Sequence, residues 1–266
     1  MPVSFAGPAR FTPAAAAVGA LPPVDAVVIS HSHYDHLCVE SVRALLALPT
    51  PPRAWVAPLG EGALLRKWGA PARAVFELDW WQRADLDHGL RITAVPAQHG
   101  SARSAWDKDA TLWCGFDVAF GGGARRVFFA GDTGYRAVPQ GTPPGSAAEA
   151  AAPTCPAFRE VRARLGAPDL ALLPIGAYSP RGFMSAVHAS PEDAVEMLLD
   201  LGATRAIGMH YGALPLTDER VEDAPARLRA ALRARGLDDA RFVTLPAVGA
   251  VWREPAREGR AGAAAT

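Results

Sequence analysis

Short apolar runs, separated by polar loops and amphipathic segments, recur along most of the chain. A β-branched run at 26–30 predicts the first strand, and helical spacing at 41–48, ended by Pro49, predicts a helix after it. The same patterns predict strands at 54–57, 75–78, 91–95, 112–120, 126–130, 170–173, 205–209, 242–245 and 250–252, and helices at 61–68, 191–201 and 224–235. Strands that alternate with short helices predict an α/β fold in which sheets are sandwiched between helices.

Three segments do not fit this alternation. Residues 1–23 are rich in Pro and Ala and have no strand or helix period, so we expect an irregular segment there. Residues 139–156 are rich in Ala, Pro, Gly and Ser. We expect residues 139–156 to form a mobile surface insertion that does not pack, and the chain from about 255 to form a disordered tail. The length suits one folded unit, so residues 1–266 are expected to form a single domain.

The charge and cysteine content argue against several kinds of partner and compartment. The chain has 27 basic and 27 acidic residues, so no net charge attracts it to nucleic acid, and no nucleic-acid partner is expected. Cys38, Cys114 and Cys155 include no Cys-x-x-Cys pair, which predicts no disulfide framework and fits a reducing cytosol. The sequence has no signal-peptide pattern and no apolar run of about 20 residues, so we expect a cytoplasmic protein.

Four potential metal ligands lie within six residues, directly after the first predicted strand. They are His31, His33, Asp35 and His36. Imidazole and carboxylate are ligands that Zn²⁺ accepts, and the intervening Ser32 and Tyr34 let alternate side chains face one point. A cluster this dense can hold two ions.

Three further ligand types each follow a predicted strand end: His99, Asp132 and His210. Taken singly, His99 and His210 could be ordinary histidines without a metal, and Asp132 could be a turn residue. The prediction therefore rests on the placement of all three at strand ends. We expect one ion on His31, His33 and His99, a second ion on Asp35, His36 and His210, and Asp132 as the bridge. Two Zn²⁺ ions that activate a shared water predict hydrolysis, and iron or manganese could occupy the same nitrogen and oxygen ligands.

On these residues the sequence resembles the metallo-β-lactamase superfamily, whose hallmark is His-x-His-x-Asp-His followed by a later His, Asp and His. Within it, the chain is similar to the branch of the N-acyl-phosphatidylethanolamine-hydrolysing phospholipases D. The segments that carry this resemblance are 2–13, 29–37, 98–99, 112–113, 128–135, 174–184 and 188–195. The resemblance implies an αββα sandwich, two zinc ions, and hydrolysis of a phosphodiester or a related ester.

The resemblance also implies roles for single residues. Asp35 and Asp132 are expected to act in catalysis as well as in metal binding. His188 matches a histidine that the family places by the metals, where it could orient the phosphate or protonate the leaving oxygen; N-terminal capping or packing next to Ser190 is an equal alternative. Tyr178 and Arg181 are candidates for substrate binding, although a loop arginine is more often a solvated charge.

Four other residues are interpreted as structural. His88 lies in an Asp-His-Gly sequence, which is typical of a hairpin turn in solvent. Trp80, Trp81 and Trp106 could line an acyl pocket, but core or covering aromatics are favoured for each.

The substrate class follows from the resemblance alone. It implies a small-molecule or lipid phosphodiester, with an N-acyl-phosphatidylethanolamine-like lipid preferred, and it leaves peripheral contact with the inner face of the membrane open. A lactonase or sugar-phosphate hydrolase of the same superfamily is the alternative enzyme. A truncated, non-catalytic metal-binding protein is an alternative of another class, since the family usually carries further strands before the segment that matches residue 2.

Overall fold

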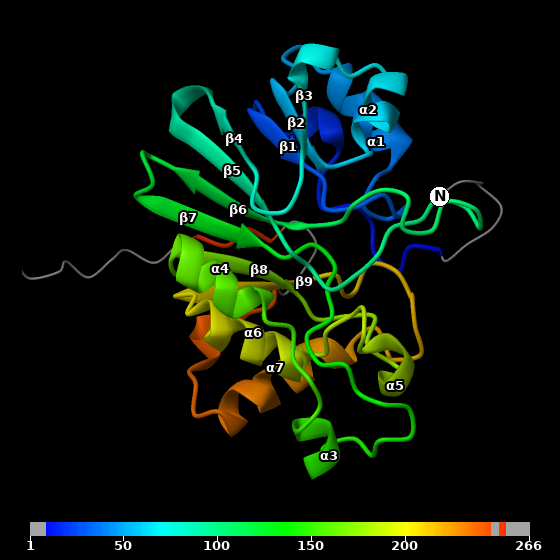
Figure 1. Cartoon of the computed structure of the whole chain (residues 1–266), viewed down its shortest axis with the longest axis vertical. Helices are drawn as coiled ribbons and strands as arrows, with labels where there is room; N and C mark the ends of the chain where they lie inside the picture. The colour runs from blue at the N-terminus through cyan, green and yellow to red at the C-terminus, as the bar shows by residue number, and fades with distance from the viewer. Residues whose placement is uncertain (1–8, 246–249, 254–266) are drawn as a thin grey trace, which may run out of the picture.

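Two β-sheets pack face to face in the computed structural model, which describes residues 9–245 and 250–253 (Figure 1). The smaller sheet has the order β1-β2-β3 and is parallel throughout. Its strands are β1 (Ala26–Val28), β2 (Ala54–Pro58) and β3 (Val75–Leu78).

The larger sheet has seven strands in the order β10-β9-β8-β7-β6-β5-β4. They are β4 (Arg83–Leu86), β5 (Leu90–Val95), β6 (Gly115–Phe120), β7 (Arg125–Phe129), β8 (Leu170–Pro174), β9 (Arg205–Met209) and β10 (Phe242–Val243). Neighbours from β4 to β7 are antiparallel, whereas those from β7 to β10 are parallel. Strands β5, β7, β8 and β9 therefore run in one direction, and their carboxyl ends meet at the same edge.

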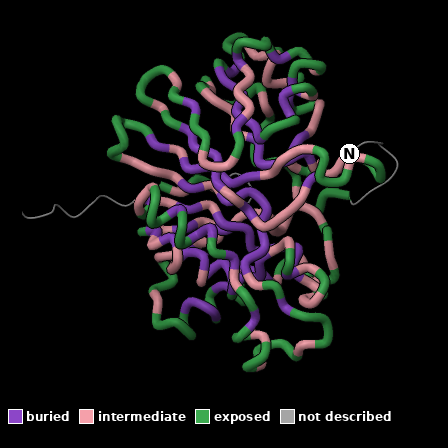
Figure 2. Tube along the Cα trace, in the orientation of Figure 1, coloured by how far each residue is buried: buried purple, intermediate pink, exposed green. Residues whose placement is uncertain are grey.

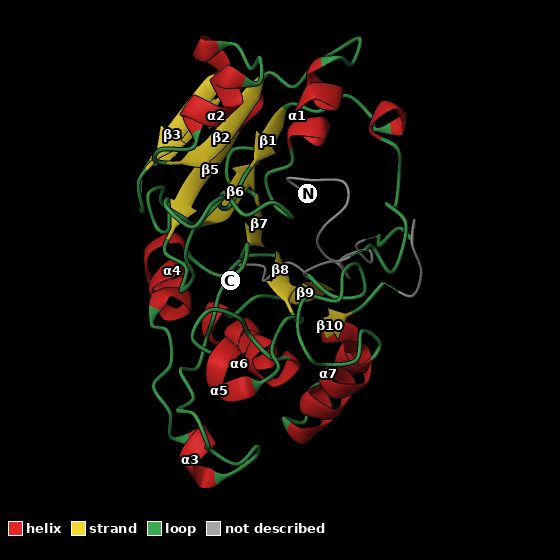
Figure 3. Ribbon diagram, turned by 90° about the vertical axis from the view of Figure 1, so that its right-hand side faces the viewer, coloured by secondary structure: helices red, strands yellow, loops and turns green. Residues whose placement is uncertain are grey.

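Helices cover the outer face of each sheet (Figures 1 and 3). The smaller sheet carries α1 (Val39–Leu46) and α2 (Gly62–Lys67), and the larger carries α4 (Ala157–Leu165), α6 (Pro191–Leu201) and α7 (Asp223–Ala234). The short helices α3 (Ala147–Ala150) and α5 (Arg181–Met184) lie in connections, and the 3-10 turns span Val18–Ala20, Ala72–Ala74, Asp87–Gly89 and Asp239–Arg241. This arrangement confirms the expected αββα sandwich. No helix in the described ranges combines the length and hydrophobicity that crossing a membrane requires.

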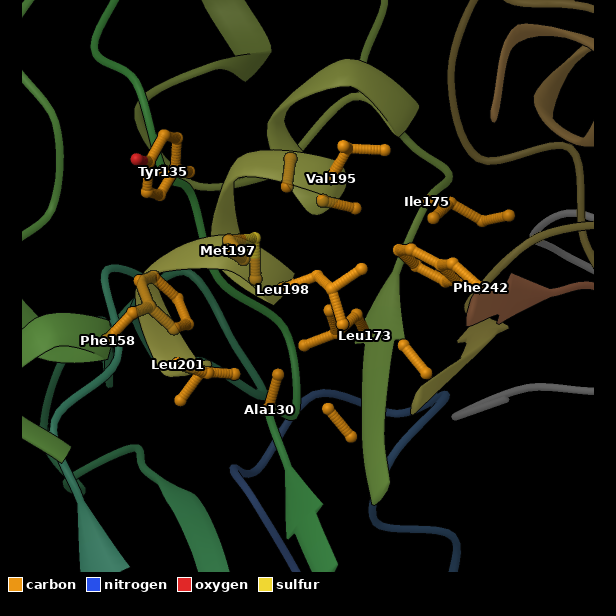
Figure 4. Close-up of a cluster of buried hydrophobic side chains, with 14 of the residues drawn as sticks. Ala130, Tyr135, Phe158, Leu173, Ile175, Val195, Met197, Leu198, Leu201 and Phe242 are labelled. Atoms are coloured by element: carbon orange, nitrogen blue, oxygen red, sulfur yellow. The ribbon is translucent and has the colours of Figure 1, made fainter. Parts of the chain in front are cut away.

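The alternation of side chains along β2 explains how the layers are held together. Trp55 points to the cluster beneath α1 and α2, whereas its neighbour Val56 joins Ile92 and Phe116 in the cluster between the two sheets. A third cluster fills the space between the larger sheet and its helices, with Leu173 and Leu198 near its centre (Figure 4). The buried stretches in Figure 2 follow these interfaces.

Helix α6 begins and ends where the sequence predicts. The Ser190 side chain accepts a hydrogen bond from the Asp193 backbone, and the Asp193 side chain accepts one from the Ser190 backbone, which forms a capping box. Pro191 occupies the first turn, and Gly202 ends the helix with φ of 64°. This helix fixes the end of the loop that contains His188.

The structure corrects several boundaries and two omissions. The first strand ends at Val28, residues 112–114 precede strand β6 rather than belong to it, and residues 250–252 form no strand. Strand β4 and helix α4 were not predicted. Strand β4 lies at a sheet edge and buries only Ala84, so its sequence has no strong apolar pattern.

The segment 139–156 is less isolated than predicted. Its middle part forms α3, capped by Ser146, and its end packs into the protein, because Ala152 and Cys155 are buried. The backbone of Cys155 donates to the Tyr135 carbonyl at 2.6 Å. The expectation that this segment does not pack is therefore wrong at its carboxyl end, while its mobility stays a prediction. The expected tail from 255 lies outside the described residues.

Candidate metal centre

The first group of candidate ligands lies in a tight loop at the end of β1. Ser30 accepts a backbone hydrogen bond from Cys114 at 2.9 Å, which ties the start of the loop to the other sheet. The backbone amides of His36 and Leu37 both donate to the His33 carbonyl, at 3.0 and 2.8 Å. The His31 ring consequently lies close to both other histidine rings of the loop, with centroid separations of 4.6 Å from His33 and 4.2 Å from His36.

The remaining candidates follow strand ends of the larger sheet, on the edge that faces this loop. His99 follows β5, Asp132 follows β7 and His210 follows β9. His210 has φ of 59°, an uncommon backbone conformation for a residue with a side chain, and such conformations concentrate at functional sites. The Asp132 Oδ2 atom lies 3.1 Å from Nε2 of both His36 and His210, and 3.9 Å from ring nitrogens of His31, His99 and His188.

The candidate ligand atoms fall into two main groups, each with its atoms within 4.8 Å of one another. The first contains His31, His33 and His99; the second contains Asp35, His36, Asp132 and His210. A third group, of His99, Asp132 and His188, overlaps them. The structure thus brings together all seven residues of the sequence-based ligand set, with Asp132 in the second group and in the overlapping third group rather than in both main groups. Metal binding by these residues, and the bridging role of Asp132, stay predictions.

The chemistry of these residues fits a pair of cations. Buried side-chain atoms without a hydrogen-bond partner include Nε2 of His31, Oδ1 of Asp132, and Nδ1 of His188 and His210. Each such group left without a partner costs about 1–3 kcal/mol, so their concentration in one place needs a compensating ligand. Imidazole nitrogens with carboxylate oxygens are a donor set for zinc, iron or manganese.

Neighbouring oxygen atoms orient two of the rings. The Nδ1 atom of His31 lies 3.0 Å from Ser30 Oγ, and that of His99 lies 2.9 Å from the Val187 carbonyl oxygen. A carbonyl can only accept, so His99 carries its proton on Nδ1, and Nε2 keeps its lone pair for a cation. The partner of His99 is a backbone atom, which has no signal in the sequence.

Ionisation in the cluster divides the histidines into two sets. Burial lowers the pKa of His31, His33 and His99, which keeps these rings neutral. Burial also acts on His36 and His210, but the Asp132 and Asp35 carboxylates together outweigh it and raise the pKa of both rings, that of His36 to about 10.

The carboxylates respond in the opposite direction. Burial opposes ionisation of Asp132, yet the charges of His210 and His36 hold its pKa well below the usual value. In Asp35 the same opposition is outweighed by hydrogen bonds with His210 and His36, so its pKa is also lowered. Both carboxylates are therefore ionised at neutral pH and available to cations.

His188 lies beside the cluster rather than at the end of a helix. Its ring stacks on that of His210 with a centroid separation of 5.6 Å and an interplanar angle of 16°. Burial lowers the pKa of His188 to about 4, so the ring is neutral at pH 7. Ser190 and Asp193 cap α6, so the capping alternative for His188 is wrong.

The structure does not bring Tyr178 or Arg181 to the ligand cluster. Arg181 forms ion pairs with Glu149 at 2.9 Å and Asp193 at 2.5 Å, and the Tyr178 ring packs under the Arg227 guanidinium at 4.4 Å. They line a separate cleft of about 790 Å³ beside α3, α6 and α7. The alternative that Arg181 is a charge in solvent is also wrong, because its side chain is ion-paired with Glu149 and Asp193 and is only 13% exposed.

The four residues interpreted as structural have mixed outcomes. His88 is exposed in the turn between β4 and β5, as predicted. Trp80 donates to the Trp113 carbonyl at 2.7 Å, and Trp81 packs on the largest core cluster, so both cover the core. Trp106 is 95% exposed, so its interpretation as a core or covering residue is wrong.

Comparisons with known proteins agree with this geometry. An uncharacterized protein of Mycobacterium tuberculosis is 38% identical over 233 residues, which cover 86% of this chain and 55% of that protein. The N-acyl-phosphatidylethanolamine-hydrolyzing phospholipase D 1 of Caenorhabditis elegans is 36% identical over 257 residues, which cover 94% of this chain and 66% of that protein. The chain therefore spans about half to two thirds of the length of these relatives.

A solved structure and a family model complete the comparison. The isothiocyanate hydrolase from Delia radicum gut bacteria shares the fold with a TM-score of 0.59 at 20% identity, over 88% of this chain and 78% of that chain. A model described as "Beta-lactamase superfamily domain" matches residues 3–211, which include every residue of the ligand cluster. The chain belongs to the beta-lactamase superfamily.

Proposed function

We propose that this protein is a metal-dependent hydrolase that uses two zinc ions to cleave a phosphodiester. The observation that carries the proposal is the position of the Asp132 carboxylate, whose Oδ2 lies within 3.9 Å of ring nitrogens from five histidines. A buried carboxylate surrounded in this way, with several ring nitrogens unpartnered, favours a bridge between two cations over a structural ion pair.

The residues of the two main groups would hold the ions. His31, His33 and His99 would bind one ion, and Asp35, His36 and His210 the other, with Asp132 between them. Bound ions of this kind lower the pKa of water toward 7 and polarise the ester that is attacked.

His188 is proposed to contact the phosphate. Its ring is neutral at pH 7 and stacks on His210, beside both main groups. A neutral imidazole can donate one hydrogen bond to a phosphate oxygen, which orients the ester for in-line attack. Of the two roles that the sequence leaves open, the lowered pKa favours orientation over proton donation to the leaving oxygen.

The proposed substrate class is a phospholipid with an N-acylated ethanolamine head group. The Caenorhabditis elegans relative is named for hydrolysis of such a lipid, and the proposal transfers that chemistry to this chain. Two exposed aromatic side chains are proposed to contact the acyl chains: Trp106, in the loop after His99, is 95% exposed, and Phe183, on α5 before His188, is 77% exposed. Peripheral contact with the inner face of the membrane, by a cytoplasmic protein, belongs to the same proposal.

Purified protein with a measured zinc content provides the test. We expect hydrolysis of bis-p-nitrophenyl phosphate, and release of N-acylethanolamine from vesicles that contain N-acyl-phosphatidylethanolamine. Turnover restricted to a lactone panel or to sugar phosphates would support the alternative enzyme instead. Folded protein with far less than one zinc per chain would contradict the metal assignment, and stoichiometric zinc without turnover of any ester would leave a non-catalytic metal-binding protein.

A further inference from the structure

The Arg103 side chain lies against the backbone of the ligand loop. Its Nη1 atom donates to the carbonyl oxygens of Ser32 at 2.7 Å and Leu37 at 2.8 Å. These two carbonyls flank residues 33–36, which contain three of the seven candidate ligands. One guanidinium nitrogen therefore bridges the two ends of the segment that carries His33, Asp35 and His36.

Aromatic rings hold the guanidinium in this position. Its Cζ lies 4.0 Å from the centroid of the Tyr34 ring and 5.2 Å from that of Trp68. Tyr34 also donates its hydroxyl to the Arg103 carbonyl at 2.8 Å. Contacts thus run in both directions between Arg103 and the loop, and they cross 71 positions of sequence between Arg103 and Ser32.

The segment that contains Arg103 is itself well fixed. The Asp107 carboxylate accepts from the backbone amides of Arg103 at 2.9 Å and Ser104 at 2.7 Å. Ser101, at the start of the same loop, donates its hydroxyl to the carbonyl of Thr111 at the other end, at 2.6 Å. Arg103 is consequently held by hydrogen bonds within a loop that begins soon after His99.

We propose that Arg103 is a positioning residue for the metal centre, because it sets the distance between the two ends of the 33–36 segment. The inference rests on the proposed function, since it concerns cation binding by His33, Asp35 and His36. The bridge leaves these side chains fewer conformations to lose when a cation binds, and oriented ligands bind metals more tightly. Lysine retains the charge but lacks the planar group that stacks on Tyr34.

Titration of metal-free protein with cobalt(II) tests the proposal, because visible absorption by this ion reports its ligand geometry. We expect Arg103→Met to weaken cobalt affinity by about 10- to 100-fold and to alter the absorption bands, as loss of an outer support typically does. Arg103→Lys is expected to be intermediate. Arg43→Met provides the matched control, because Arg43 is exposed on α1 just after the ligand loop.

The outcomes separate this inference from the proposed function. If wild-type protein fails to bind cobalt at any defined stoichiometry, both are overturned. If wild type binds but folded Arg103→Met matches it in affinity and spectrum, only the role of Arg103 is overturned. Should Arg103→Met fail to fold, Arg103→Lys decides: wild-type affinity and spectrum contradict the inference, whereas weaker binding that Arg43→Met does not share supports it.

Discussion

The Nε2 atom of His36 lies 3.1 Å from Oδ2 of Asp132. In metal-free protein this is an ion pair, since the carboxylate raises the pKa of His36 to about 10 while the imidazolium helps to lower that of Asp132. The same two atoms are candidate ligands of one cation. A cation can bind there only if it displaces the proton on His36, so metal affinity and protonation are coupled.

Zinc binding near pH 7.5 should therefore release protons. The pKa of His36 is raised to about 10 in metal-free protein, so we expect about one proton to leave this ring for each fully loaded chain, and the raised pKa of His210 should add to the release. Apparent affinity should rise with pH. Calorimetric titration in buffers of different ionisation enthalpy measures the number released, and His36→Ala should release fewer. Binding of zinc with no proton release would contradict the assignment of these two histidines as ligands.

Substitution of the proposed bridge or of one histidine ligand should abolish turnover. Asp132→Asn removes the charge that is proposed to bridge the two ions, and His36→Ala removes a ligand, so either change should leave less than about one-thousandth of wild-type kcat/KM. Zinc content should fall in parallel, while circular dichroism should show that the sandwich persists. Turnover close to wild type in either variant would refute the proposed centre.

His88→Ala is the control for these variants. His88 is also a histidine, but it is exposed in the turn between β4 and β5, away from the strand ends that carry the ligands. Its replacement should leave zinc content and turnover unchanged.

His188→Asn should separate substrate positioning from metal binding. We expect kcat to fall about 100-fold with zinc content unchanged, since His188 is proposed to contact the phosphate rather than to hold an ion. Burial lowers the pKa of His188 to about 4, so its ring stays neutral from pH 6 to 9 and should add no step to the pH–rate profile in that range. Loss of a basic limb on substitution would show instead that His188 delivers a proton.

The strand-end residues of this centre can be predicted from sequence for a definite reason. Each of His99, Asp132 and His210 follows an apolar run closely, and the ends of strands that run in one direction meet at one edge. The start of α6 is equally readable, because Ser190, Pro191 and Asp193 form a local signal that needs no tertiary contact.

Long-range polar contacts have no such signal. The partner Glu149 lies 32 residues from Arg181, inside a segment whose composition predicts no packing at all, so the sequence left Arg181 free for substrate. Arg103 was missed for the same reason, as its two acceptors are backbone carbonyls. Every residue has a backbone carbonyl, so the residue type does not indicate which carbonyl will accept a hydrogen bond.

Glu61 should make the stability of metal-free protein depend on pH. Its side chain is fully buried, neither carboxylate oxygen has a hydrogen-bond partner, and burial raises its pKa from 4.5 to about 8. The native chain then keeps a proton that the unfolded chain gives up between these values. The free energy of unfolding should fall as pH rises through this range, because the unfolded state binds fewer protons.

Glu61→Gln removes this titration, so the free energy of unfolding of the variant should not fall with pH for this reason. Near pH 5 the variant and wild type should unfold at similar urea concentrations, whereas at pH 8 the variant should be more stable by about 2–4 kcal/mol. A chelator keeps metal binding from contributing. Glu160→Gln serves as the control, because Glu160 is exposed and only 3.8 Å from Arg164 in a surface pair. A difference between Glu61→Gln and wild type that stays constant from pH 5 to 8 would show that Glu61 does not titrate in this window, and that its carboxylate finds a partner in solution.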